Sequence, residues 1–142
     1  MIAYLDSSAI IKLYLVDEAG MAELHEIATG SARLATSRLS YVEVRAGLAA
    51  ARRANRLAPI EHDRAVESFD MSWPGYFVVE LTEAVGARAG AIAETFGLRA
   101  GDAIQLASVL ELDLEQTMIV AWDARLRFAS HAAGVATYPA GV

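Results

Sequence analysis

The sequence contains no cysteine, and this absence removes several kinds of chemistry from consideration. Without cysteine the chain forms no disulfide, no thiolate metal site and no cysteine nucleophile. No uninterrupted apolar run reaches the roughly 18 residues that a membrane-spanning helix needs. The first residues, Met1-Ile2-Ala3-Tyr4-Leu5-Asp6, lack the positive segment and long apolar run of a signal peptide. We therefore expect a cytoplasmic protein that does not enter the membrane.

The sequence also has few positively charged residues. The chain has 12 lysine and arginine residues against 18 aspartate and glutamate residues, for a net charge of −6 and a pI near 5.0. This balance weighs against a protein that holds nucleic acid mainly through a broad basic surface. It leaves open a nuclease whose bound metal supplies positive charge locally.

What the sequence has in abundance is apolar residues, which make up 55% of its 142 positions. This composition predicts one packed domain over residues 1–142. Short β-rich runs predict strands at residues 2–5, 33–36, 76–81, 117–122 and 135–138. Longer periodic segments predict helices at residues 7–15, 19–29, 37–53, 59–71, 82–96, 102–112 and 124–133. The alternation indicates an α/β fold, a three-layer α/β/α domain with a central parallel sheet.

Two aspartates follow predicted strands directly. Asp6 ends the first strand and Asp123 ends the run Thr117 to Trp122, and a helix follows each of them. Both fit the N-cap of a helix, since aspartate is a preferred cap. Both also fit a site, because ligands bind beyond the carboxyl ends of parallel strands.

A third aspartate, Asp102, lies at the start of a predicted helix. Gln105 follows three residues later, so the pair resembles a capping box. Asp102 also shares a helical face with Leu106 and Val109, which turns it towards the core. A carboxylate in that position needs a partner or a metal.

Glu43 lies at the edge of an apolar stripe on the third predicted helix. The stripe consists of Leu39, Val42, Ala46 and Ala49. The alternatives to a functional role are a glutamate that extends its carboxylate to solvent and an ion pair with Arg38, Arg45 or Arg88.

Taken together, the four acids indicate a metal site. Carboxylates that lie close together repel one another and need a cation or altered pKa values. Ligation by oxygen alone favours hard cations such as Mg²⁺ or Mn²⁺. A cation held in this way activates a water molecule and stabilises charge on a phosphodiester, and four acids suit one ion or two.

Four segments of the chain resemble the PIN domain, and in particular the VapC-type toxin ribonucleases of bacterial toxin–antitoxin pairs. They are M-I-A-Y-L-D-S-S-A-I-I-K-L-Y, S-Y-V-E-V, G-D-A-I-Q-L-A and V-A-W-D-A-R-L, in this order along nearly the whole chain. The resemblance implies a magnesium-dependent endoribonuclease, with Mn²⁺ as a possible substitute. It also implies a homodimer, an RNA substrate, and an antitoxin whose C-terminal segment covers the active site.

The same resemblance assigns roles to individual residues. It implies that Asp6 and Asp102 are the primary metal ligands, that Glu43 supports the metal directly or through water, and that Asp123 completes the cluster. Ser8 falls where the family often has a small polar residue beside the site. Ala121 departs from the pattern, because the family often has a hydroxyl two residues before the last acid.

Other features of the sequence allow further interpretations. The basic stretch at residues 51–56 suits either an RNA backbone contact or a solvated helix end. Several cations near the acids in sequence suit either phosphate binding or ion pairing: Lys12, Arg38, Arg45 and Arg99. Two tryptophans suit either base stacking or packing: Trp73 and Trp122. The histidines are scattered and form no ligand pair: His25, His62 and His131.

Three competing functions remain at this stage. A phosphatase with a nucleophilic aspartate usually needs a second acid two residues after Asp6, where this chain has Ser8. A receiver-type regulatory domain pairs two acids near the N-terminus, where this chain has one. A catalytically silent PIN-like module that binds RNA or protein is the main alternative, with the acids serving as helix caps.

Overall fold

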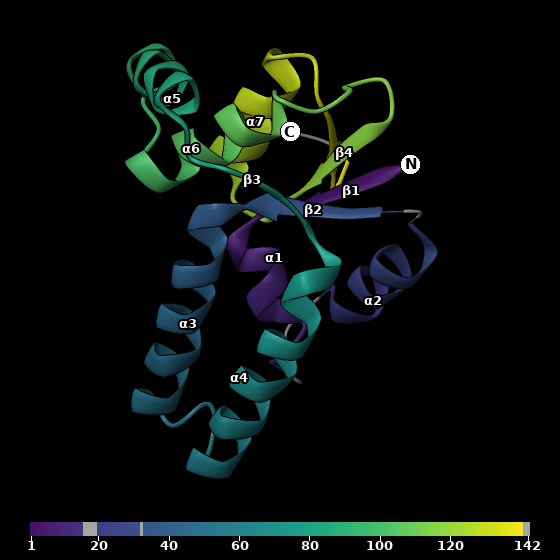
Figure 1. Cartoon of the computed structure of the whole chain (residues 1–142), viewed down its shortest axis with the longest axis vertical. Helices are drawn as coiled ribbons and strands as arrows, with labels where there is room; N and C mark the ends of the chain where they lie inside the picture. The colour runs from purple at the N-terminus through teal and green to yellow at the C-terminus, as the bar shows by residue number, and fades with distance from the viewer. Residues whose placement is uncertain (16–19, 32, 141–142) are drawn as a thin grey trace.

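Figure 1 shows the computed structural model, which describes residues 1–15, 20–31 and 33–140. The strands are β1 (Ile2–Leu5), β2 (Arg33–Ser37), β3 (Phe77–Val79), β4 (Thr117–Val120) and β5 (Ala136–Tyr138). The helices are α1 (Ser7–Lys12), α2 (Met21–Gly30), α3 (Arg38–Arg53), α4 (Pro59–Ser72), α5 (Glu83–Phe96), α6 (Ala100–Val109) and α7 (Ala124–Ala132). A 3₁₀ turn, η1 (Trp73–Gly75), follows α4. In the described ranges no helix is both long and apolar enough to span a membrane.

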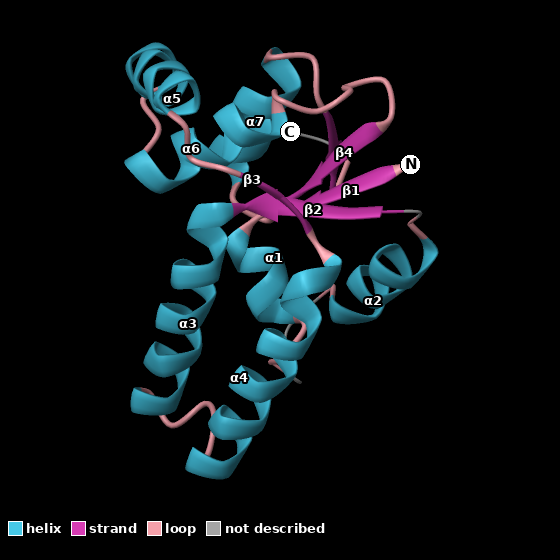
Figure 2. Cartoon of the chain, viewed as in Figure 1, coloured by secondary structure: helices cyan, strands magenta, loops and turns pink. Residues whose placement is uncertain are grey.

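The five strands form one parallel sheet in the order β3-β2-β1-β4-β5. Figure 2 shows the labelled strands β1, β2 and β4 side by side in the middle of the molecule. β1 lies at the centre, with Ile2 paired to Arg33 of β2 on one side and to Thr117 of β4 on the other. All carboxyl ends therefore point to the same edge. The predicted parallel α/β/α fold is confirmed.

Helices cover both faces of the sheet and enclose two separate hydrophobic cores. Helices α1 to α4 lie on one side of the sheet, and α5 to α7 lie on the other (Figure 1). Side chains alternate along β1, so Ala3 and Leu5 enter the first core and Tyr4 enters the second. All three are fully buried, as expected for a central strand between two layers of helices.

Several predicted boundaries differ from those in the structure. The strand predicted at residues 76–81 is shorter, because Tyr76 ends the 3₁₀ turn and Glu80 is exposed beside Arg38. The helix predicted from residue 102 begins at Ala100. The first helix ends at Lys12 rather than at residue 15. Residue 19, the predicted start of the second helix, lies outside the described residues.

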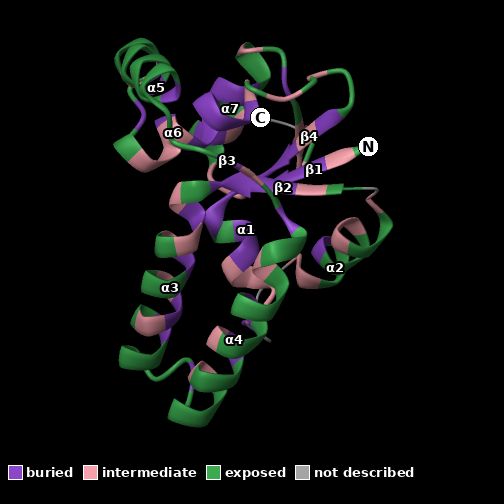
Figure 3. Ribbon diagram, in the orientation of Figure 1, coloured by how far each residue is buried: buried purple, intermediate pink, exposed green. Residues whose placement is uncertain are grey.

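The buried face of α3 is not the one that the sequence predicted. Ser40, Val44, Leu48 and Ala51 are its buried residues. Val42, part of the predicted stripe, is 64% exposed, and the exposed turns of this helix are green in Figure 3. The prediction was wrong for two reasons. Alanine is apolar, but its small side chain gains little from burial, so it does not determine which face packs on the core. The small polar residue Ser40 lies on the buried face.

Candidate active site

Four acidic side chains line one cavity of about 430 Å³ at the carboxyl edge of the sheet: Asp6, Glu43, Asp102 and Asp123. Asp6 follows β1, Asp123 follows β4, and the other two come from α3 and α6. The structure therefore brings together all four acids that the sequence singled out. The rest of the wall is formed by Ser7, Ser8, Ile11, Arg99, Gln105 and Trp122.

Asp6 caps a helix and also faces the cavity, so the two interpretations of this residue are compatible. One carboxylate oxygen, Oδ1, accepts hydrogen bonds from the Ala9 backbone N–H at 2.8 Å and from the Ser8 hydroxyl at 2.8 Å. Only 4% of the residue is exposed. The pKa of Asp6 is raised to about 7, chiefly by burial and also by the nearby charges of Asp102 and Glu43, while the two hydrogen bonds act to lower it.

Asp123 and Asp102 both line the cavity, and they are close enough for their charges to interact. Asp123 caps α7 by accepting the Leu126 backbone N–H at 2.9 Å. Burial raises the pKa of Asp102, the charge of Asp123 adds to this effect, and Arg99 opposes it. The capping box predicted for Asp102 and Gln105 is wrong, because Arg99 occupies the N-cap and Asp102 lies within the first turn.

Glu43 is held by neutral groups rather than by a cation. Its Oε1 accepts a hydrogen bond from the Ser7 hydroxyl at 2.7 Å and one from Gln105 Nε2 at 3.2 Å. The three arginines proposed as its partners bind other acids: Arg38 pairs with Glu80, Arg45 with Asp70 and Arg88 with Glu111. The alternative explanation of Glu43 as an ion-paired surface glutamate is therefore wrong.

The donor set of the cavity fits a hard divalent cation. In the described part of the chain, no three acidic or histidine side chains converge closely enough to enclose an ion by themselves. This open arrangement suits Mg²⁺, which keeps several water ligands and is usually bound by one or two carboxylates together with substrate phosphates. A carboxylate as buried as Asp6 needs either a proton or a cation beside it.

Comparison with known families identifies the family of this chain. The PIN domain profile matches residues 3–130. The chain belongs to the PIN domain family. Ribonuclease VapC45 of Mycobacterium tuberculosis (strain CDC 1551 / Oshkosh) is 38% identical over 139 residues, covering 98% of this chain and 96% of the relative. Ribonuclease VapC49 of M. tuberculosis (strain ATCC 25618 / H37Rv) has the same identity and coverage. The resemblance inferred from the motifs is confirmed.

Solved structures agree with this PIN domain in fold. FitAcB from Neisseria gonorrhoeae superimposes with a TM-score of 0.71 at 20% identity, covering 97% of this chain and 96% of that chain. A toxin–antitoxin complex from Klebsiella pneumoniae gives a TM-score of 0.66 at 18% identity, covering 95% and 96%. At these identities the likeness concerns the fold alone.

Behind the acids of this PIN domain lies a buried hydrogen-bond network that the sequence did not reveal. The Tyr4 hydroxyl donates to Gln105 Oε1 at 2.6 Å. Gln105 Nε2 in turn donates to Ser7 Oγ at 2.9 Å and to Ser40 Oγ at 3.0 Å. Thr36 Oγ1 lies 2.8 Å from Ser40 Oγ and donates to the Leu5 carbonyl. The network links β1, α1, α3 and α6, and it orients Glu43.

The histidines and tryptophans that the sequence also offered as candidates lie outside the acidic cavity or pack against other aromatic rings. None of the three histidines lies among the residues described as lining the acidic cavity. Trp73 packs on the rings of Tyr41, Phe69 and Tyr76. Trp122 contributes to the cavity wall while its ring packs edge-on against Tyr138.

We expect Gly101→Ala to lower catalysis without lowering stability. A Cβ atom at Gly101 would lie 3.0 Å from Glu43 Oε2, so the new methyl group displaces that carboxylate. We expect the cleavage rate to fall about 10-fold, since small misplacements at a site are costly. Alanine is also a better helix former than glycine by up to about 1 kcal/mol, so thermal unfolding should not occur at a lower temperature.

Gly30→Ala is the matched control, because a Cβ atom at Gly30 meets nothing within 4 Å. It should leave cleavage unchanged. Equal rates for both variants in a fluorogenic RNA assay would show that the placement of Glu43 does not matter.

Proposed function

We propose that this PIN domain is a metal-dependent endoribonuclease that cleaves RNA phosphodiester bonds by hydrolysis. The observation that carries the proposal is the convergence of Asp6, Glu43, Asp102 and Asp123, from four separate segments, on one cavity at the carboxyl edge of the sheet. The two relatives from M. tuberculosis bear the name ribonuclease, which supports RNA as the substrate.

Asp6 and Asp102 are the residues that would hold Mg²⁺ directly, with Glu43 and Asp123 acting directly or through water. Mg²⁺ bound there would lower the pKa of a water molecule and neutralise charge on the scissile phosphate. The chain's own contribution is orientation. Ser8 and the Ala9 N–H fix the Asp6 carboxylate, and Ser7 fixes Glu43. The described cavity contains no histidine to act as a base, so proton acceptance falls to solvent and the carboxylates.

We further propose that the chain is the toxin of a toxin–antitoxin pair that acts in the cytoplasm. Structural neighbours include a toxin–antitoxin complex from K. pneumoniae and a VapBC-1 structure from nontypeable Haemophilus influenzae, which supports an antitoxin as partner. A homodimer is supported by a groove of about 320 Å³ between α5 and α6, whose lining includes Leu81 and Ile104 and no charged residue. Sedimentation of the purified chain tests the dimer.

The decisive experiment is RNA cleavage by the purified chain with Mg²⁺ or Mn²⁺ and with EDTA. Cleavage should require the metal and should fall by at least about 1000-fold in Asp6→Ala and Asp102→Ala, as expected when direct metal ligands are lost. Cleavage that survives both substitutions would place the activity elsewhere. RNA binding that needs no divalent ion, with no cleavage of any RNA, would identify a binding module instead.

A further inference from the structure

A second hollow adjoins the acidic cavity, between the starts of α6 and α7. This hollow measures about 390 Å³ and is lined by Leu98, Arg99, Asp102, Ala124, Arg125 and Asp123. Arg99, Asp102 and Asp123 line both spaces, so the two are neighbours. The first space is lined by four carboxylates and one arginine, and the second by two carboxylates and two arginines.

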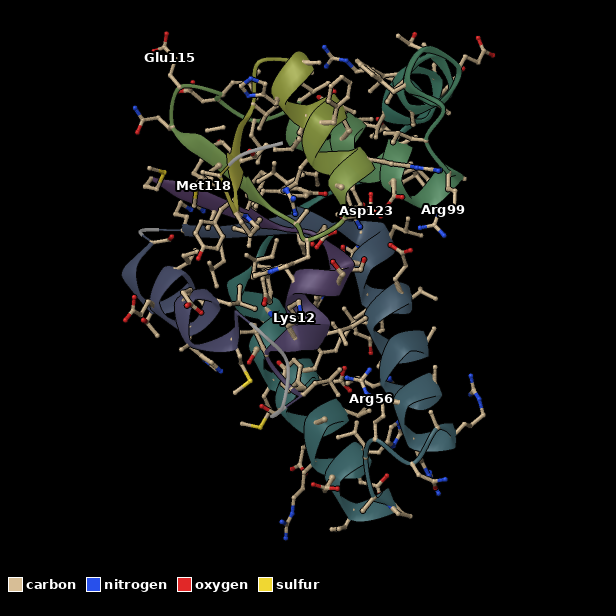
Figure 4. The ribbon with its side chains drawn as sticks, turned by 180° about the vertical axis from the view of Figure 1, so that it is seen from behind. Lys12, Arg56, Arg99, Glu115, Met118 and Asp123 are labelled. Carbon is tan, nitrogen blue, oxygen red and sulfur yellow. The ribbon has the colours of Figure 1, made fainter. Side chains whose placement is uncertain are left out.

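Arg99 is placed at this junction but is weakly engaged. Its guanidinium nitrogen lies 3.7 Å from Asp102 Oδ2, which is too long for a hydrogen bond, and its side chain is 82% exposed. Ion pairs with this exposure contribute little to stability, so Arg99 can change partners easily. In Figure 4 Arg99 and Asp123 lie at the same height of the molecule, and both line the two hollows.

Arg125 lines the same hollow as Arg99 and lies in the first turn of α7. It is exposed, and it forms no ion pair or hydrogen bond with the residues that the structure describes. A cation in the first turn of a helix is opposed by the helix dipole, so this position does not stabilise α7. The placement of Arg125 is better explained by an anion that binds in the hollow.

We propose that Arg99 and Arg125, here called the cationic rim, bind a backbone phosphate of the RNA next to the scissile phosphate. The inference rests on the proposed ribonuclease function and adds the direction in which the strand leaves the acidic cavity, towards α7. Arg99 and Arg125 are positioning residues in this scheme, and they take no part in the hydrolysis itself.

Electrostatics gives the reason for such a rim. A cluster of four carboxylates on a chain of net charge −6 repels a polyanion until metal and cations compensate for it. Guanidinium groups match phosphate with a planar pair of donors, which fixes the orientation of the strand as well as its charge. The two arginines that line the second hollow supply positive charge beside the four carboxylates.

The basic stretch at residues 51–56 is a poor alternative for this role. Arg53 lies ten residues after Glu43 on the same helix, a separation of about 15 Å along the axis. Figure 4 shows Arg56 well away from Asp123 and Arg99. Arg52 and Arg53 are exposed at the end of α3, where cations complement the helix dipole.

The test compares two double variants that change net charge equally: Arg99→Ala with Arg125→Ala, and Arg52→Ala with Arg53→Ala. Binding of a fluorescein-labelled, mixed-sequence single-stranded RNA is measured in the Asp6→Asn background as a function of salt. For the rim variant we expect Kd to rise about 10-fold. We also expect the slope of log Kd against log salt to fall by about 0.7 for each phosphate that the protein no longer neutralises. The α3 variant should match its parent.

Cleavage by the same variants in the wild-type background separates the inference from the function on which it rests. The rim variant should raise KM and leave kcat within about twofold, and Arg99→Lys with Arg125→Lys should recover part of the affinity. Equal Kd and salt dependence for both double variants, or a loss of kcat alone, would show that the cationic rim does not bind phosphate. Cleavage by the wild type would still support the nuclease function in that case. If the wild type cleaves no RNA, the nuclease function is rejected, and the binding comparison shows only whether the cationic rim binds RNA phosphate.

Discussion

Asp6→Asn is expected to abolish RNA cleavage and, at the same time, to stabilise the metal-free protein. Asparagine retains an oxygen that accepts from the Ala9 N–H and Ser8, so the cap of α1 is kept. It removes a buried negative charge that faces two other carboxylates. We expect cleavage to fall at least about 1000-fold, since a direct metal ligand is lost.

The gain in stability should depend on pH in a defined direction. The pKa of Asp6 is about 7 in the folded chain against an ordinary value of 3.8, so the folded state holds this proton more tightly than the unfolded state. The stability that the Asp6 proton contributes to the metal-free protein is therefore fully present below about pH 4. It declines between about pH 4 and 7 and is absent above about pH 7. A pKa difference of this size corresponds to roughly 4 kcal/mol as an upper value.

Urea unfolding in EDTA at pH 5 and at pH 8 measures this effect. Wild type should lose on the order of 2–3 kcal/mol between the two conditions, and Asp6→Asn should lose much less. Mg²⁺ should restore the wild type at pH 8 and have little effect on Asp6→Asn, because ligands that bind the folded state stabilise it. A variant that remains as sensitive to pH as wild type would show that Asp6 is not the buried acid responsible.

Gln105→Leu should destabilise the fold and impair the site together. Gln105 is 2% exposed and binds Tyr4, Ser7, Ser40 and Glu43, so leucine leaves several buried polar groups without a partner. Each group left in this way costs about 1–3 kcal/mol, and we expect a total loss near 3 kcal/mol. Cleavage should fall roughly 10- to 100-fold, as is usual when groups that orient metal ligands are removed.

Tyr4→Phe is the matched control for Gln105→Leu. It removes one hydroxyl from the same network and leaves the amide donors of Gln105 in place. We expect a loss of about 1 kcal/mol in unfolding free energy and cleavage close to that of wild type. Wild-type cleavage by Gln105→Leu would mean that Glu43 does not depend on the network.

The sequence allowed the sheet and the four acids to be predicted because both leave local signals. A short apolar run that ends in aspartate marks a strand and its exit, as at Asp6 and Asp123. Asp102 and Glu43 were found through helical periodicity and a family resemblance. For Glu43 the predicted apolar stripe was nevertheless the wrong face of α3.

The buried network escaped prediction because its members are far apart in the sequence. Tyr4 and Gln105 are 101 positions apart, and Gln105 and Ser40 are 65 apart. A glutamine that follows an aspartate by three residues resembles part of a capping box in the sequence. Only the packing of α6 on the sheet places the side chain of Gln105 in the interior. The predicted arginine partners of Glu43 failed for the same reason, because Glu80, Asp70 and Glu111 come from other elements.

On the proposed nuclease function, the central position of β1 also determines when the site is completed during synthesis of the chain. β1 is synthesised first but pairs with β4, which begins at Thr117, and Asp123 follows β4. A nascent chain therefore carries Asp6 and Glu43, and later Asp102, before it has the strand that completes the acidic edge. Activity should appear late and abruptly, when β4 leaves the ribosome, so incomplete chains are harmless to the RNA around them.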